Sequence, residues 1–106
     1  MPKYMVQASY TPEGTKGLLK EGGTGRRAAV EKVVSSLGGQ VESMYYAFGE
    51  NDLFVILDFP DQISMAAVAM AVKTSGTLDT KATVLLTPEE IDLAAQKSVD
   101  FRPPGG

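Results

Sequence analysis

Two residue types that carry much of enzyme and metal chemistry are missing from the chain: it has no cysteine and no histidine. Without cysteine there are no disulfides, no thiolate nucleophiles and no cysteine-ligated metals. Without histidine the chain lacks the commonest general base, the commonest transition-metal ligand and the usual haem ligand. We therefore expect no metal site and no cofactor.

Basic charge and long hydrophobic runs are also scarce. Ten Lys and Arg residues stand against 13 Asp and Glu, which leaves a net charge of -3. This balance argues against broad nucleic-acid binding and against attraction to anionic membranes. No apolar run approaches the length of a membrane span, and the N-terminus has no signal-peptide pattern. The expected location is cytoplasmic.

The residues that are present fit one folded domain. The chain has 106 residues, of which 43% are hydrophobic and 22% are charged. We expect the domain to cover residues 1–98 and a flexible tail to cover 99–106, where proline and glycine gather. A domain of this size buries a modest share of its surface, so oligomerisation is a plausible source of further burial.

Hydrophobic periodicity divides the chain into strands and helices. The order predicts an α+β, ferredoxin-like βαββαβ domain: a four-stranded antiparallel sheet, both helices on one face, and an extra C-terminal helix. The glycine-rich residues 12–25 are interpreted as a loop with one helical turn. The expected strands are 3–10, 40–48, 52–59 and 78–86, and the expected helices are 26–37, 62–74 and 88–97.

The face of the sheet opposite the helices is unusually apolar. The third strand is apolar at every position from Leu53 to Leu57, and Met5 lies opposite Val6 on the first strand. An apolar patch of this kind is typical of a contact surface. A second copy packed sheet to sheet across a two-fold axis, or a larger homo-oligomer, would cover it. The alternative is that the C-terminal helix 88–97 folds back over it.

In the second strand, too, strict alternation would point successive side chains to opposite faces of the sheet. Gln40 to Phe48 then divide into one face with three apolar residues and a second face with two. The first face holds Gln40, Glu42, Met44, Tyr46 and Phe48; the second holds Val41 and Tyr45.

Several short motifs resemble the GYD domain family, over about residues 2 to 95. They are Tyr10-Thr11-Pro12-Glu13-Gly14, Leu37-Gly38-Gly39, Phe48-Gly49-Glu50-Asn51-Asp52-Leu53, Asp58-Phe59-Pro60-Asp61 and Thr87-Pro88-Glu89-Glu90. The resemblance implies a fold of the dimeric α+β barrel type, which small oxygenases, isomerases, stress proteins and effector-binding domains share. The family itself is functionally uncharacterised. One departure is Asn51, which stands where the family's naming motif has tyrosine.

Two residues near the expected sheet mouth are candidates for catalysis or ligand binding. Asp52 starts the third strand, where a carboxylate could act as a base or bind an amine; the alternative is a turn residue that accepts backbone hydrogen bonds. Tyr10 ends the first strand, and its hydroxyl could bind a ligand, as could those of Tyr45 and Tyr46. The alternative for all three tyrosines is a core or interface position.

Arg26 and Arg27 are further ligand-binding candidates. They follow Gly22-Gly23-Thr24-Gly25, and glycines before a helix could hold an anion at the helix N-terminus. The Gly-Lys-[Ser/Thr] ending of a P-loop is absent. A flexible loop followed by a solvated helix start is the alternative.

These features favour a homo-oligomeric small-molecule-binding or accessory protein. Its pocket would lie between sheet and helices, near Tyr10, residues 12–25 and Asp52. A cofactor-independent oxygenase or isomerase, with Asp52 and a tyrosine as acid and base, is one alternative. A structural oligomerisation module without a ligand is another.

Overall fold

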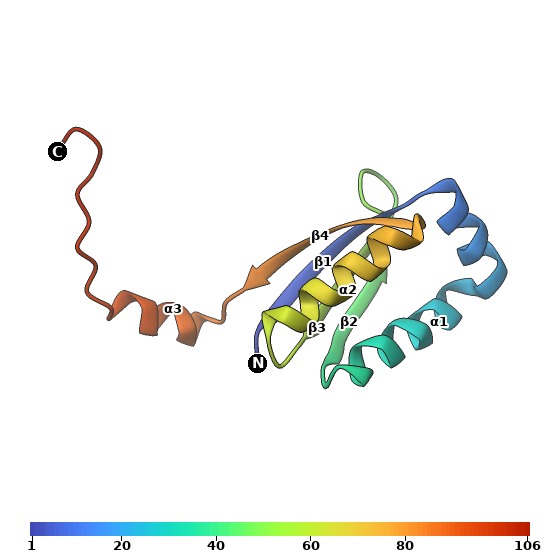
Figure 1. The fold of residues 1–106 in the computed structure, drawn as a ribbon, viewed down its shortest axis with the longest axis horizontal. Coiled ribbons are helices and arrows are strands. Elements are labelled where there is room, and N and C mark those ends of the chain that lie inside the picture. Colours follow the sequence, from blue (N-terminus) through green and yellow to red (C-terminus); the bar gives the residue numbers. More distant parts are fainter.

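The computed structural model describes residues 1–106 as one four-stranded sheet and three helices (Figure 1). The strands match the predicted ones to within about two residues at each end. The elements are β1 (Lys3–Tyr10), α1 (Pro12–Ser36), β2 (Gln40–Tyr46), β3 (Leu53–Asp58), α2 (Gln62–Ser75), β4 (Leu78–Leu85) and α3 (Pro88–Ala95).

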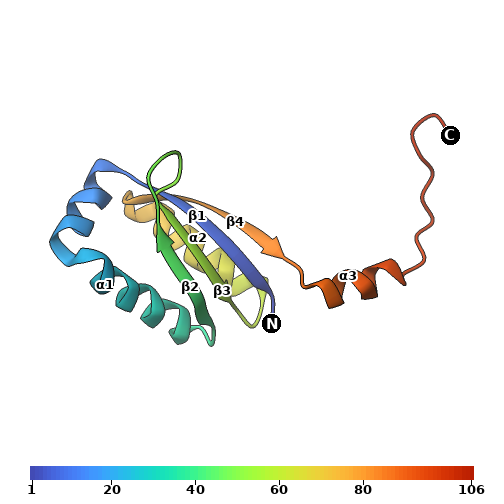
Figure 2. The same cartoon turned by 180° about the vertical axis from the view of Figure 1, so that it is seen from behind.

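The sheet has the order β2-β3-β1-β4, and every neighbouring pair is antiparallel. Helices α1 and α2 cover one face, as the two opposite views make plain (Figures 1 and 2). The predicted α+β ferredoxin-like architecture is therefore confirmed.

The core lies between this sheet and the two helices. Alternate residues of the central strands point toward the helices, so that Tyr4, Val6 and Ala8 of β1 are buried. The opposing residues of β3 are buried too, and Phe59 and Val34 lose essentially all solvent contact. Because each buried side chain of this size contributes about 1.5–3 kcal/mol, these two central strands dominate the stability of the domain.

The N-terminal half of α1 corrects the prediction of a loop at residues 12–25. Thr11 caps the helix, since its side chain accepts a hydrogen bond from the Gly14 backbone, and Pro12 follows at the first helical position. Glycine disfavours helices on average, but here it permits close packing: a Cβ on Gly14 would overlap the Thr77 carbonyl. Gly22, with φ at 79°, breaks the helix into two segments.

Strand β2 corrects the prediction of strict alternation. A bulge between Val41 and Ser43 shifts the register by one residue. Val41 and Met44 consequently both pack against the core, on the helix side. Tyr45 pairs with Phe54 and belongs to the open face instead.

Helix α3 projects away from the sheet, so the alternative that it folds back over the open face is wrong (Figures 1 and 2). All its residues are exposed, and it makes no substantial packing contact with another element. The chain is accordingly elongated, with extents of 56 × 33 × 23 Å. We call α3 and residues 96–106 the C-terminal arm.

Candidate functional site

A cavity of about 180 Å³ separates α1 and α2 from the sheet. It exists because the two helices do not pack closely against each other and because alanine and valine line much of it. Arg26 and Thr80 are the two polar residues among the 16 that line it. The others include Val6, Ala8, Ala29, Val30, Val34, Leu53, Val55, Leu57, Met65, Val68, Ala69, Val72 and Leu78.

Arg26 is the charged residue of this cavity. It follows the break at Gly22, and its side chain is 29% exposed. Its guanidinium Nη1 lies 3.4 Å from Glu21 Oε2, at the long end of the hydrogen-bond range. An ion pair of this length with a partner near the surface contributes little to stability. Because a guanidinium has five N–H donors, Arg26 keeps capacity for another acceptor.

A second hollow, of about 400 Å³, lies where β1 and β2 end and β3 begins. Tyr10, Tyr46 and Asp52 line it together with Gly23 from the second segment of α1. The Tyr46 hydroxyl donates to the Gly23 carbonyl at 3.4 Å. A Cβ on Gly23 would lie 3.2 Å from the Tyr46 ring, so a larger residue would push the ring away.

Tyr46 is the group in this hollow whose acidity is strongly altered. Partial burial raises the pKa of its hydroxyl to about 12, and the neighbouring Tyr10 hydroxyl adds to the effect. The positive charges of Arg26 and Arg27 oppose it. Tyr46 therefore stays protonated at neutral pH and can donate a hydrogen bond, but it is poorly suited to act as a base.

Asp52 is already engaged by the backbone around it. Its Oδ2 accepts a hydrogen bond from the Tyr10 backbone N–H at 2.9 Å. Its own N–H donates to the Ala8 carbonyl, and its carbonyl accepts from the Ala47 N–H, both at 2.8 Å. These contacts join the ends of three strands, which is the role of a turn residue.

The structure thus brings together some of the predicted site residues and separates others. Tyr10 and Asp52 share the second hollow, and Arg26 lines the cavity. Tyr45 is 71% exposed and lines a different, shallow hollow with Arg27.

The sequence reasoning named Tyr46 among the tyrosines that could line a pocket, but it did not single Tyr46 out. It expected a pocket between sheet and helices near Tyr10 and Asp52, and neither residue lines the apolar cavity. Alternation did not say whether Tyr46 lies on the same face of the sheet as Tyr10. The structure places the two tyrosines together in the second hollow, beyond the bulge in β2. No local signal could reveal the cavity, which depends on the distance between two helices.

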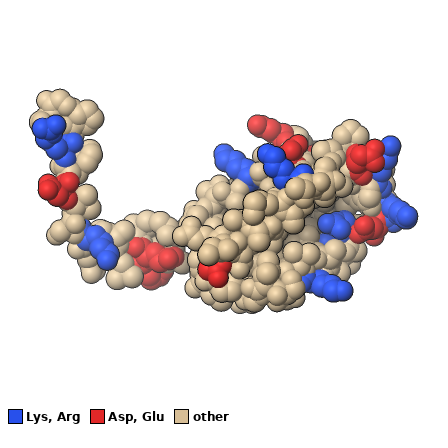
Figure 3. Space-filling model, viewed as in Figure 1, with Lys and Arg blue, Asp and Glu red and all other residues tan.

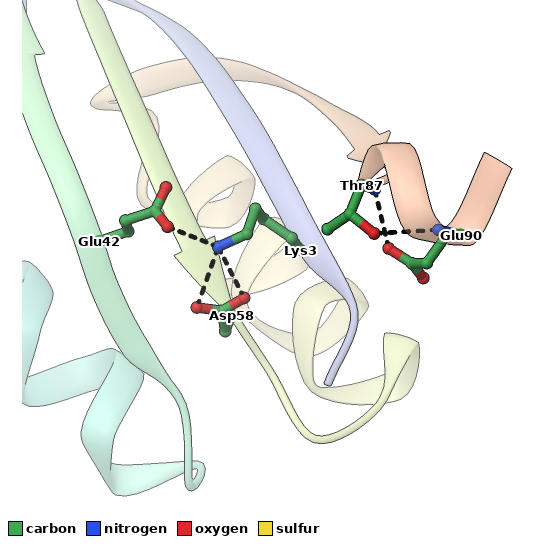
Figure 4. A network of polar contacts seen from close by, with 5 residues as sticks. All are labelled: Lys3, Glu42, Asp58, Thr87 and Glu90. Carbon is green, nitrogen blue, oxygen red and sulfur yellow. Dashed lines mark hydrogen bonds and ion pairs between the residues drawn. The ribbon is translucent and has the colours of Figure 1, made fainter. Parts of the chain in front are cut away.

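The open face of the sheet carries a separate polar cluster (Figure 4). Lys3 Nζ lies 2.8 Å from Glu42 Oε1 and 3.1 Å from Asp58 Oδ1. Hydrogen bonding to Glu42, and then to Asp58, raises the pKa of Lys3. The cluster is paired internally, so we assign it a structural role.

The structure lacks two other features, a cluster of metal ligands and a membrane-spanning helix. No group of three or more Asp, Glu, His or Cys side chains is placed to hold a metal ion. None of the three helices has the length and apolar character needed to cross a bilayer.

Comparisons with known proteins agree with the fold. A family model described as GYD domain matches residues 4–95. The crystal structure of FFRP-DM1 is similar in fold, with a TM-score of 0.51 and 15% sequence identity, over 81% of this chain and 100% of that one. A search of curated proteins gives no match.

Proposed function

The chain belongs to the GYD domain family, and we propose that it is a small-molecule-binding protein that works as a homo-oligomer. The observation that carries the binding proposal is the apolar cavity between the helices and the sheet. An engineered apolar cavity of about 150 Å³ binds benzene, so about 180 Å³ is room for a compact organic molecule.

A thermal-shift screen tests the binding proposal. Small aromatic and branched aliphatic compounds should raise the melting temperature, because a ligand that binds only the folded state stabilises it. Ala69→Leu adds a larger side chain at the cavity wall and should abolish the shift. Ala66→Leu is the matched control, since Ala66 lies on the same helix and is exposed.

The screen has a clear negative outcome. If no compound shifts the melting temperature of the wild type, or if Ala69→Leu responds as the wild type does, the cavity is not a binding site.

The oligomer proposal depends on the open face of the sheet. Met5, Phe54 and Ile56 are neighbours there in the strand register, and no element of the same chain covers them. A second copy related by a two-fold axis would bring the same patch against itself. The Lys3 cluster on this face pairs one ammonium with two carboxylates, so each of its three charges has a partner of opposite sign although one negative charge is left over.

The C-terminal arm supports the same proposal. Its apolar side chains are well exposed: Ile91, Leu93, Val99 and Phe101 range from 51% to 78%. Apolar side chains exposed together on one segment are typical of a contact surface, and contact with a second copy would bury them. We propose that the arm packs against the partner.

A further inference from the structure

We infer that the cavity accepts a compact apolar monocarboxylate, such as an aromatic or short branched aliphatic acid, whose carboxylate pairs with Arg26. This inference rests on the proposed binding function and adds the chemical class of the ligand.

Charge at the cavity wall favours an anion. Arg26 is the single charged residue that lines the cavity, and no carboxylate lines it. Helix α2, which forms one side, has Lys73 as its single charged residue, and its surface is largely uncharged (Figure 3). A carboxylate beside Arg26 would therefore be attracted by the guanidinium and would meet no negative charge on the wall. An ammonium group would be repelled by Arg26 and would find no carboxylate on the wall.

Arg26 is placed to bind a carboxylate well. Its side chain is mostly shielded from water, which strengthens an ion pair relative to a fully exposed one. The fork of a guanidinium matches the two oxygens of a carboxylate. Arg26 already contacts a carboxylate, that of Glu21, through one long hydrogen bond. A ligand carboxylate at closer range would replace this contact, and Glu21, at 47% side-chain exposure, could turn to solvent.

The rest of the lining selects against a second polar group on the ligand. Apart from Arg26, the hydroxyl of Thr80 is the one polar side-chain group available in the cavity. A sugar or a dicarboxylate would bury donors or acceptors without partners, which costs free energy. A single carboxylate on an apolar body fits both the volume and the lining.

Titration calorimetry with three probes of one shape tests the inference: phenylacetate, its neutral amide phenylacetamide, and toluene. A charge-assisted contact should make phenylacetate bind at least about tenfold more tightly than phenylacetamide. Arg26→Met should reduce phenylacetate to the level of the amide and leave toluene unchanged. Arg27→Met is the matched control, because Arg27 does not line the cavity, and it should retain the wild-type preference.

Two more variants keep the test independent of folding defects. Arg26→Lys retains the charge and should keep part of the preference for the acid. Glu21→Gln removes the competing carboxylate and should tighten phenylacetate binding without affecting phenylacetamide. Circular dichroism verifies that each variant is folded.

The outcomes separate this inference from the proposal beneath it. Equal binding of acid and amide, with both abolished by Ala69→Leu, overturns the preference for a carboxylate and leaves the cavity as a binding site. Unchanged phenylacetate affinity in Arg26→Met also overturns it. No binding of any of the three probes overturns the inference and counts against the binding function as well.

Discussion

At the scale of single residues, Asp52 is the side chain whose role is most open to experiment. Its carboxylate accepts the Tyr10 N–H in a partly buried place. Asp52→Ala should leave that N–H without its acceptor and lower the free energy of unfolding by about 1–3 kcal/mol. Asp52→Asn keeps an acceptor oxygen and should cost less. Urea denaturation measures both.

A catalytic role for Asp52 would give a different pattern. Asp52→Asn would then abolish turnover of a substrate as fully as Asp52→Ala does, although it costs less stability.

Tyr46 gives a pH-dependent prediction. Its pKa is about 12 in the folded chain against an ordinary value of 10.0, so the folded state retains the proton that the unfolded state releases. The contribution of Tyr46 to stability is therefore complete below pH 10 and is lost as pH rises from about 10 to about 12. Between about pH 9 and about pH 11, the wild type should lose more stability than Tyr46→Phe in urea denaturation.

The titration of Lys3 does not affect this comparison. Its pKa is also raised, above 10.5, and its contribution is also lost in alkaline solution. Both proteins contain Lys3, so its effect cancels in the difference. Parallel pH profiles for the wild type and Tyr46→Phe would contradict the prediction.

At the scale of elements, two threonine caps provide a matched pair. Thr11 caps α1 and also donates to the Gly76 carbonyl at 2.7 Å. Thr87 caps α3 in a complete capping box with Glu90 (Figure 4). Thr11→Ala should reduce the free energy of unfolding by about 1–2 kcal/mol. At concentrations where the chain is monomeric, Thr87→Ala should leave global unfolding unchanged, because α3 makes no substantial contact with the rest of its own chain.

Urea denaturation gives the global stability of both variants, and amide exchange at Ile91 reports on α3 alone. Faster exchange at Ile91 with unchanged global stability is expected for Thr87→Ala. A large global loss in that variant would mean that the C-terminal arm is coupled to the domain.

The elements also show how far sequence reasoning reaches. The central strands β1 and β3 were predictable because one face of each alternates into the core. The first half of α1 was not, because five glycines argued for a loop, whereas two of them, Gly14 and Gly23, sit in the helix where it packs closely against Thr77 and Tyr46. A usable signal existed nonetheless, since Thr11-Pro12 repeats the threonine–proline helix start of Thr87-Pro88.

The candidate site was less predictable than the fold. Tyr10 and Asp52 were found because strand ends meet at a sheet edge. The bulge in β2, beyond which Tyr46 joins them, leaves no sequence signature in the alternation of apolar residues. The cavity volume depends on how α1 and α2 diverge, and a linear pattern does not encode that distance.

At the scale of the whole molecule, the proposed dimer is tested at the open face. Ile56→Lys places a charge at the centre of the apolar patch and should convert the protein to a monomer. Ile63→Lys is the control, since Ile63 is an 80% exposed residue on the outer surface of α2. Light scattering after size exclusion measures the mass. A monomeric wild type, or a dimer that tolerates Ile56→Lys, would contradict the proposal.

The placement of both helices on one face has a consequence for how ligand binding and assembly relate. If the open faces join two copies, the two cavities lie on opposite, outer sides of the assembly. Each cavity is then built wholly from one chain. Each chain should then bind one ligand. Binding to one chain should not change the affinity of the other, because the two cavities share no residue. By thermodynamic linkage, dilution that separates the copies should leave ligand affinity unchanged, and saturating ligand should leave the dissociation constant of the assembly unchanged.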